Sequence, residues 1–207
     1  MLKIFNDYEI ELDNSSFIGK YPLVLLGEED IASLESPEEY RRFASAFEEE
    51  SIYELMKLSK EITGYNTLDH ICGVHYLAVK LAKALKSKGL DVDLGRVSGS
   101  AAGHDIGKYG CKGQELKRVP YLHYYYSDQW FLRHDIHYIR NIAVNHSTWD
   151  LELENLPIES LILIYSDFRV KNKENTSTPT MWIYSLEESF QIILNKLDNV
   201  DEAKERR

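Results

Sequence analysis

Apolar residues recur three and four positions apart along most of the chain, which is the spacing of helices that bury one face. Ser36, followed by Pro37 and two acids, indicates a helix start, and the capping-box spacing from Ser51 to Glu54 indicates another. Residues 1–30 show only short alternation with Asn-Ser-Ser and Gly, which favours a hairpin or an extended arm. The pattern predicts an all-α fold, a helical bundle with a small strand-like N-terminal arm.

A length of 207 residues suits one compact domain. We expect residues 1–50 to form the arm, with short strands and a helix, and residues 51–207 to form the helical domain. Loops are expected at polar or Gly-rich stretches, namely residues 64–67, 89–93, 107–126, 150–157 and 171–180. A terminal helix is expected over residues 182–197.

The first candidate ligand is a histidine on an apolar stripe. On a helix over residues 70–89, His70 shares one face with Val74 and three leucines, and Gly89 provides a stop. His70 is therefore expected to face the interior. His75 points away from this stripe and is expected at the surface.

A His-Asp pair ends the run of small residues "SGSAAG" at 98–103. His104 and Asp105 share a stripe with Val97 and Ala101, so both polar groups are expected to face inward. The small residues let neighbouring helices approach closely, and we expect Gly107 to end this helix. A buried carboxylate without a partner costs several kcal/mol, so the pair should meet partners from other helices.

Two later segments supply further candidates. If Asp135 caps a helix beginning at Ile136, His146 lies on the apolar face and His134 lies in the turn before it. His137, in the first turn, could replace His134 as a ligand, and we favour His134.

Asp167 interrupts a segment, residues 157–170, that is apolar on almost every side and is therefore expected to be a central helix. Together, these histidines and carboxylates on four helices are hard to explain as packing. They predict a shared cation site.

The overall charge and the cysteines narrow the partners and the compartment. A formal net charge of −10 opposes binding of a long nucleic acid, which needs a broad positive surface. Cys72 and Cys111 lack metal-type spacing, and no secretory leader or membrane-length apolar run is present. We expect a cytoplasmic protein with reduced thiols, no membrane partner, and a small phosphorylated substrate, while its oligomeric state stays open.

The segment "HDIGK", with an upstream His and a downstream Asp on apolar helices, resembles the HD-domain superfamily of metal-dependent phosphohydrolases over residues 53–173. The further histidines resemble the ligands of its binuclear subgroup. The resemblance implies two divalent ions, Fe, Mn or another transition metal, with Asp105 bridging them. The implied ligands are His70, His104, Asp105, His134, His146 and Asp167.

The resemblance also implies hydrolysis of a nucleotide or other small phosphate ester through a metal-bound hydroxide. Asp105 and Lys108 are the expected catalytic residues, and Lys108, Arg169 and Lys171 are candidates for contacting the substrate phosphate. The aromatic stretch at residues 121–131 could stack on a base or close over the site, and His123 is expected in that loop or behind the ligands. The alternatives are an HD-fold di-iron oxygenase and a non-catalytic HD-like sensory or interaction module.

Overall fold

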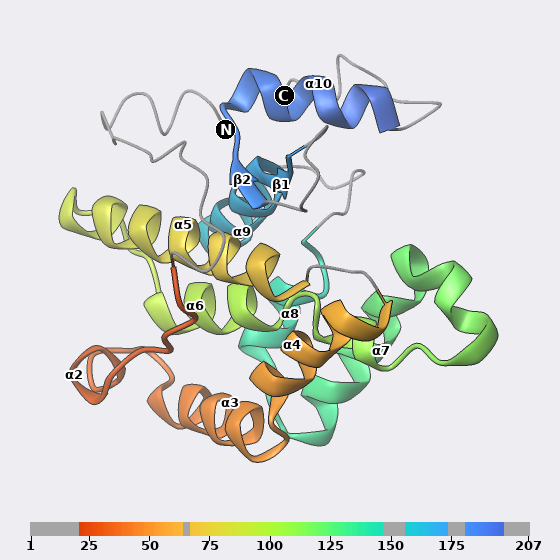
Figure 1. Ribbon diagram of the computed structural model, residues 1–207. Coiled ribbons are helices and arrows are strands. Elements are labelled where there is room, and N and C mark those ends of the chain that lie inside the picture. Colours follow the sequence, from red (N-terminus) through yellow and green to blue (C-terminus); the bar gives the residue numbers. More distant parts are fainter. Residues whose placement is uncertain (1–20, 64–66, 147–155, 174–180, 197–207) are drawn as a thin grey trace.

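Figure 1 shows the computed structural model, which describes residues 21–63, 67–146, 156–173 and 181–196. Helices dominate this part of the chain, and the predicted all-α class is confirmed. The α-helices are α2 (Glu28–Ile31), α3 (Pro37–Glu49), α4 (Ile52–Thr63), α5 (Thr67–Ser87), α6 (Leu94–Gly103), α7 (Val119–Arg133), α8 (Tyr138–Ala143), α9 (Ile158–Arg169) and α10 (Leu186–Lys196). The 3₁₀ helices are η1 (Ile106–Tyr109) and η2 (Gly113–Arg118).

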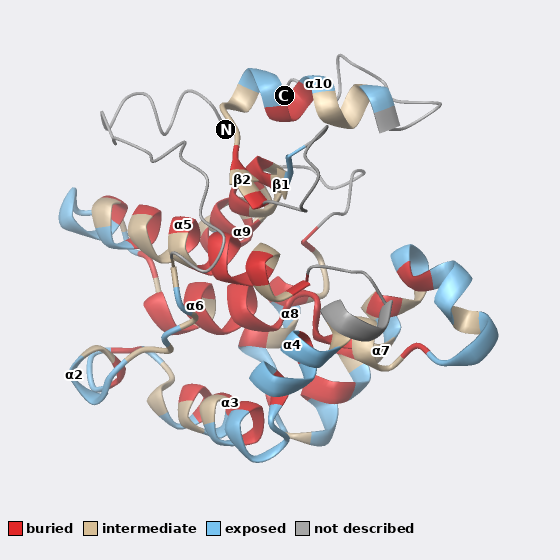
Figure 2. Ribbon diagram, in the orientation of Figure 1, coloured by how far each residue is buried: buried red, intermediate tan, exposed pale blue. Residues whose placement is uncertain are grey.

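The long helix α5 lies at the centre of the molecule and packs against α6 and α9 (Figure 1). Helix α8 packs on α6, and α7 packs on η1. Figure 2 shows buried residues concentrated on α5, α6 and α9, with exposed residues on the outer faces of α2, α3 and α7. Tyr40 and Phe43 of α3 belong to the same apolar cluster as Leu77 of α5 and Ile183, so α3 contributes to the core that surrounds the central helices.

The small residues of α6 allow other helices to approach, as predicted. A Cβ atom on Gly99 would lie 2.6 Å from Ile139 Cδ1 of α8, and one on Gly103 would lie 2.8 Å from Phe131 Cζ of α7. The stop at Gly89 is also confirmed. Gly89 has a φ of +89°, and Leu90 N–H donates to the Leu85 carbonyl at 3.2 Å, which closes the end of α5.

Several predicted boundaries were wrong. Helix α6 ends at Gly103 instead of Gly107, and residues 107–126 are mostly helical, in η1, η2 and the first half of α7. Helix α8 begins at Tyr138, because Asp135 takes a φ of +54° in the preceding turn and does not cap residue 136.

The C-terminal part contains a hairpin that the helical pattern did not predict. Strand β1 (Val170–Asn172) pairs antiparallel with β2 (Met181–Ile183), with Val170 opposite Ile183. Because residues 181–183 form β2, the terminal helix α10 begins at Leu186 and not at the predicted residue 182. At the other end, residues 21–27 form no strand, and the hairpin expected before them lies outside the described residues. Among the described helices, none combines the length and the apolar character needed to cross a membrane.

Candidate metal centre

Four side chains from three separate segments of the chain meet between α5, α6 and α9. His70 lies on α5, His104 and Asp105 lie in the turn between α6 and η1, and Asp167 lies on α9. His70 Nε2 is 3.0 Å from Asp167 Oδ1 and 3.3 Å from His104 Nε2. His104 Nε2 is 3.6 Å from Asp105 Oδ2 and 3.9 Å from Asp167 Oδ1. The fold thus gathers four of the six residues that the resemblance implies as ligands.

Two more histidines extend this cluster. His146 follows α8, and its ring centroid is 4.8 Å from that of His104. His123, on α7, places Nε2 3.6 Å from Asp105 Oδ1, while Asp105 Oδ2 faces His70 at 3.7 Å. The two oxygens of Asp105 therefore face different imidazoles, an arrangement suited to a bridging carboxylate.

Three imidazoles of the cluster are oriented by backbone carbonyls. The Nδ1 atoms of His104, His123 and His146 lie 2.9, 2.8 and 2.6 Å from the carbonyl oxygens of Ala101, Val119 and Ala143 respectively. A carbonyl only accepts hydrogen bonds, so we assign the proton to Nδ1 in each ring. The Nε2 lone pair is then directed at the cluster, as in histidines that bind metals.

The histidines outside the cluster use Nε2 differently. His75 Nε2 lies 2.9 Å from Ser98 Oγ, His134 Nε2 lies 2.8 Å from Glu50 Oε1, and His137 Nε2 lies 2.8 Å from Asp135 Oδ1. In each of them a protein group occupies the atom that a metal would need. These hydrogen bonds distinguish His75, His134 and His137 from His104, His123 and His146, whose Nδ1 atoms bond to backbone carbonyls.

Burial and charge prepare the cluster for cations. Burial lowers the pKa of His104 and His123, and it lowers that of His146 to about 4, so these rings are neutral near pH 7. Burial acts to raise the pKa of Asp105 and of Asp167. Lys108 beside Asp105 and Lys171 beside Asp167, together with the neighbouring histidines, more than offset that effect, so the pKa of each carboxyl is lowered and both carboxylates stay ionised.

The donor set fits a transition metal. The donor atoms of His70, His104 and Asp167 lie within 4.8 Å of one another, and so do those of His104, Asp105 and His146. Neutral imidazoles and ionised carboxylates without a thiolate suit Fe, Mn, Co, Ni or Zn, and the ligand type does not choose among them.

Two of the three predicted phosphate-binding cations lie at the cluster. Lys108 Nζ bonds to Asp105 Oδ2, and Lys171 Nζ lies 3.9 Å from Asp167 Oδ1 while donating to the Asp167 carbonyl at 2.8 Å. Arg169 does not join them. It is buried, and its guanidinium donates to the Tyr184 carbonyl at 2.6 Å and to the Tyr165 hydroxyl at 2.9 Å, which ties α9 to the segment after β2.

His134 is not brought to the cluster. It forms the C-cap of α7, where it bonds to Glu50 and its ring packs 4.7 Å from that of Trp130. His137, the alternative, has a half-exposed side chain and bonds to Asp135. His123 lies beside Asp105 in the cluster, where His134 or His137 was expected.

Sequence reasoning missed His123 because residues 107–126 were expected to form a loop. As part of α7, His123 and Ser127 lie four residues apart on one face. Ser127 Oγ donates to the His104 carbonyl at 3.1 Å and accepts from Gly107 N–H at 3.0 Å. A Cβ on Gly107 would lie 1.9 Å from the His123 carbonyl, so only glycine permits this approach of η1 to α7. A helical interpretation of residues 119–133 would have indicated this face.

The aromatic stretch of α7 reaches the cluster through Tyr124. Its ring centroid lies 3.9 Å from that of His123 and 5.0 Å from that of His146. Burial, followed by the charges of Asp167 and Asp105, raises the pKa of Tyr124 and keeps its hydroxyl protonated. Tyr121 and Tyr125 on the same helix are exposed.

The surface position predicted for His75 was wrong. Its residue is 5% exposed, and the side chain lies in a buried chain of hydrogen bonds. Ser98 Oγ contacts both His75 Nε2 at 2.9 Å and the Tyr40 hydroxyl at 2.8 Å, and that hydroxyl accepts from Leu26 N–H at 2.9 Å. These bonds join α3, α5 and α6 next to, but outside, the cluster.

Comparison of the chain with protein-family models, with curated proteins and with solved structures returned no match.

Proposed function

We propose that the protein is a metal-dependent phosphohydrolase of the HD type that acts on a nucleotide or another small phosphate ester. The observation that supports this proposal best is Asp105. Its Oδ1 faces the buried imidazole of His123, its Oδ2 faces the partly buried imidazole of His70, and Lys108 Nζ bonds to Oδ2.

The ligand residues of this proposal are His70, His104, Asp105, His123, His146 and Asp167. The carbonyl-bonded Nδ1 atoms fix the imidazole planes, so Nε2 is pre-oriented for binding. Two divalent cations held there would polarise phosphoryl oxygens and lower the pKa of a bound water towards neutrality.

The lysines would serve the substrate side. Lys108 and Lys171 end beside two ligand carboxylates, and their side chains are 24% and 17% exposed, so both ammonium groups can be reached by a phosphate at the cluster. In the hydrolysis, a water oxygen would bond to phosphorus while the ester P–O bond breaks, and the departing oxygen would take up the proton that the water loses, which gives phosphate and an alcohol. The ring of Tyr124 packs against His123 and His146, and its protonated hydroxyl would help to orient the phosphate.

A pair of variants on α7 tests the ligand assignment. His123→Ala should lower the content of the second metal ion and reduce phosphatase turnover by about 100-fold or more, because it removes a ligand with a fixed orientation. His134→Ala is the matched control and should retain metal content and turnover. The measurements are elemental analysis after loading with Mn²⁺ or Fe²⁺, and phosphate release from nucleoside monophosphates and p-nitrophenyl phosphate.

Two results would overturn the proposal. One is a protein that binds less than one equivalent of metal after loading and releases no phosphate. The other is a metal-loaded protein that consumes oxygen and has no phosphatase activity, which would favour the alternative function of a di-iron oxygenase.

A further inference from the structure

A cleft lies between α4, η1 and α7, apart from the metal centre. Its volume is about 470 Å³, within the range of pockets that bind small organic molecules. None of the six proposed ligand residues lines it, and neither does Lys108. Segment η1 separates the two sites, since Ile106, Gly107 and Tyr109 line the cleft whereas Lys108 bonds to Asp105.

The walls of the cleft offer flat aromatic faces. Tyr109 lines it from η1, and Tyr125, Tyr126 and Trp130 line it from α7. Trp130 is 5% exposed, but Tyr125 is 59% exposed at the rim, so the aromatic surface runs from the interior to solvent. Such faces bind planar rings by stacking.

The charges that line the cleft favour an anion. Glu50 is already engaged, because its carboxylate accepts from Trp130 Nε1 at 2.7 Å and contacts His134 Nε2 at 2.8 Å. Lys112 and Arg133 also line the cleft, and neither forms an ion pair within the described part of the chain. In a chain of net charge −10, two such cations beside an aromatic wall form a local complement to a negative group.

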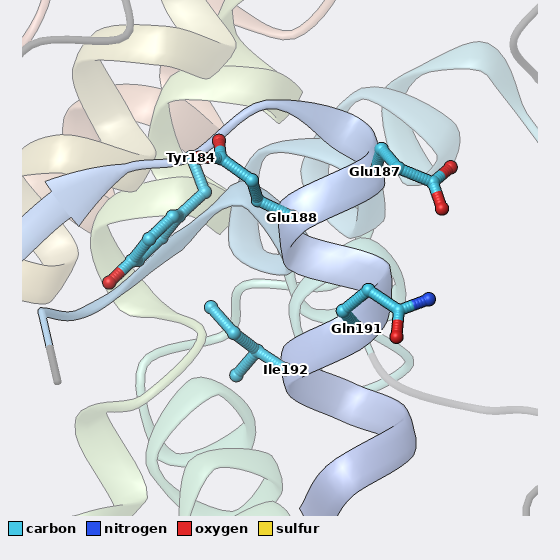
Figure 3. Close-up of a pocket in the computed structure, with 5 residues that line it drawn as sticks. All are labelled: Tyr184, Glu187, Glu188, Gln191 and Ile192. Atoms are coloured by element: carbon cyan, nitrogen blue, oxygen red, sulfur yellow. The ribbon is translucent and has the colours of Figure 1, made fainter.

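A surface hollow beside α10 lacks these features. It has a volume of about 320 Å³ and is bordered by the start of α10. Figure 3 shows Glu187 and Gln191 projecting to one side of the helix and Tyr184 and Ile192 to the other. Its charged lining residues are the acids Glu187 and Glu188, so it offers no cation to an anionic ligand.

We propose that the cleft between α4, η1 and α7 binds a small planar aromatic anion of the nucleoside monophosphate class. The base stacks on Tyr125 and its aromatic neighbours, and the phosphate pairs with Arg133 and Lys112. This site is independent of the proposed hydrolytic function, because it requires no metal.

Adenosine monophosphate is the probe, and isothermal titration calorimetry on the full chain in EDTA is the assay. We expect saturable binding of one equivalent that persists in Asp105→Asn. Arg133→Gln and Tyr125→Ala should each weaken it about fivefold or more, as should removal of the phosphate in adenosine. The matched controls are Arg118→Gln and Tyr121→Ala, exposed residues that do not line the cleft, and they should leave the affinity unchanged.

The outcomes separate this site from the metal centre. Binding that vanishes in EDTA and in Asp105→Asn, but survives Arg133→Gln, would assign the nucleotide to the metal centre and overturn the proposal. An absence of binding at millimolar concentration would also overturn it, as would equal losses in the controls. Because Tyr125 and Arg133 are exposed, far-ultraviolet circular dichroism should be the same for each variant as for the wild type.

Discussion

Replacing His75 by alanine removes a buried imidazole and breaks the chain of hydrogen bonds that joins α3, α5 and α6. Loss of a buried ring leaves a cavity that costs about 2–4 kcal/mol, and the lost bond to Ser98 adds about 1 kcal/mol. We therefore expect His75→Ala to lower the free energy of unfolding by about 3–5 kcal/mol at pH 7.5. Metal content should change little, because His75 lies outside the cluster.

The pH dependence gives this prediction a second, independent part. Burial lowers the pKa of His75 to about 4 in the folded protein, against about 6.5 in the unfolded chain. The unfolded state therefore binds a proton first as the pH falls below about 6.5, and the folded wild type loses stability from there towards pH 4. At pH 5 this loss is about 2 kcal/mol for His75. His75→Ala lacks the titrating imidazole and does not lose this stability, so the difference in the free energy of unfolding between wild type and variant should narrow by about that amount.

Urea unfolding followed by circular dichroism at pH 7.5 and pH 5 measures both quantities. His75→Gln is the matched control, since its amide can still bond to Ser98 but does not titrate. It should be more stable than His75→Ala and should show the same narrowing with pH. A destabilisation below 1 kcal/mol at pH 7.5, or a difference between wild type and His75→Ala that does not depend on pH, would refute the reasoning.

Two further predictions concern the site and its support. Asp105→Ala should abolish both metal binding and turnover, because it removes the carboxylate whose two oxygens face His70 and His123. A variant that retains full metal content in elemental analysis would contradict this prediction. Gly107→Ala should destabilise the fold by about 2–3 kcal/mol and reduce metal content, because its Cβ would overlap the His123 carbonyl. Gly27→Ala, where nothing lies within 4 Å of the added Cβ, is the control, and equal thermal unfolding temperatures for the two variants would contradict the proposed contact.

The sequence by itself determined the helical class and the inward direction of the central candidates. Helical spacing directs His70, His104 and Asp105 to the interior because each shares a stripe with apolar residues that must be buried. The same reasoning led to Gly89 as the end of α5 and to the small residues of α6 as points of close approach. These features are local, and the chain around each residue contains the information.

Which histidine joins the cluster was decided by the tertiary structure. His123 and His134 are eleven residues apart, close to three full turns, so on one helix they point the same way but lie about 16 Å apart along its axis. Periodicity cannot tell them apart. Gly107 of η1 packs closely against α7, so the first half of that helix lies beside Asp105 and brings His123 to it. His134, at the other end of α7, lies beside Glu50.

His75 and Arg169 illustrate the same limit. A single apolar stripe assumes one buried face, but α5 packs against α4, α6, α9 and the hairpin, so the side that carries His75 is covered as well. Arg169 follows Asp167 closely in the sequence, yet a carbonyl acceptor from Tyr184, directly after β2, and a hydroxyl acceptor from Tyr165 of α9 hold its guanidinium away from the cluster. The burial of a side chain depends on which elements cover its face of the helix, and its hydrogen bonds depend on which acceptors the fold brings near. Both are fixed only when distant segments of the chain pack together.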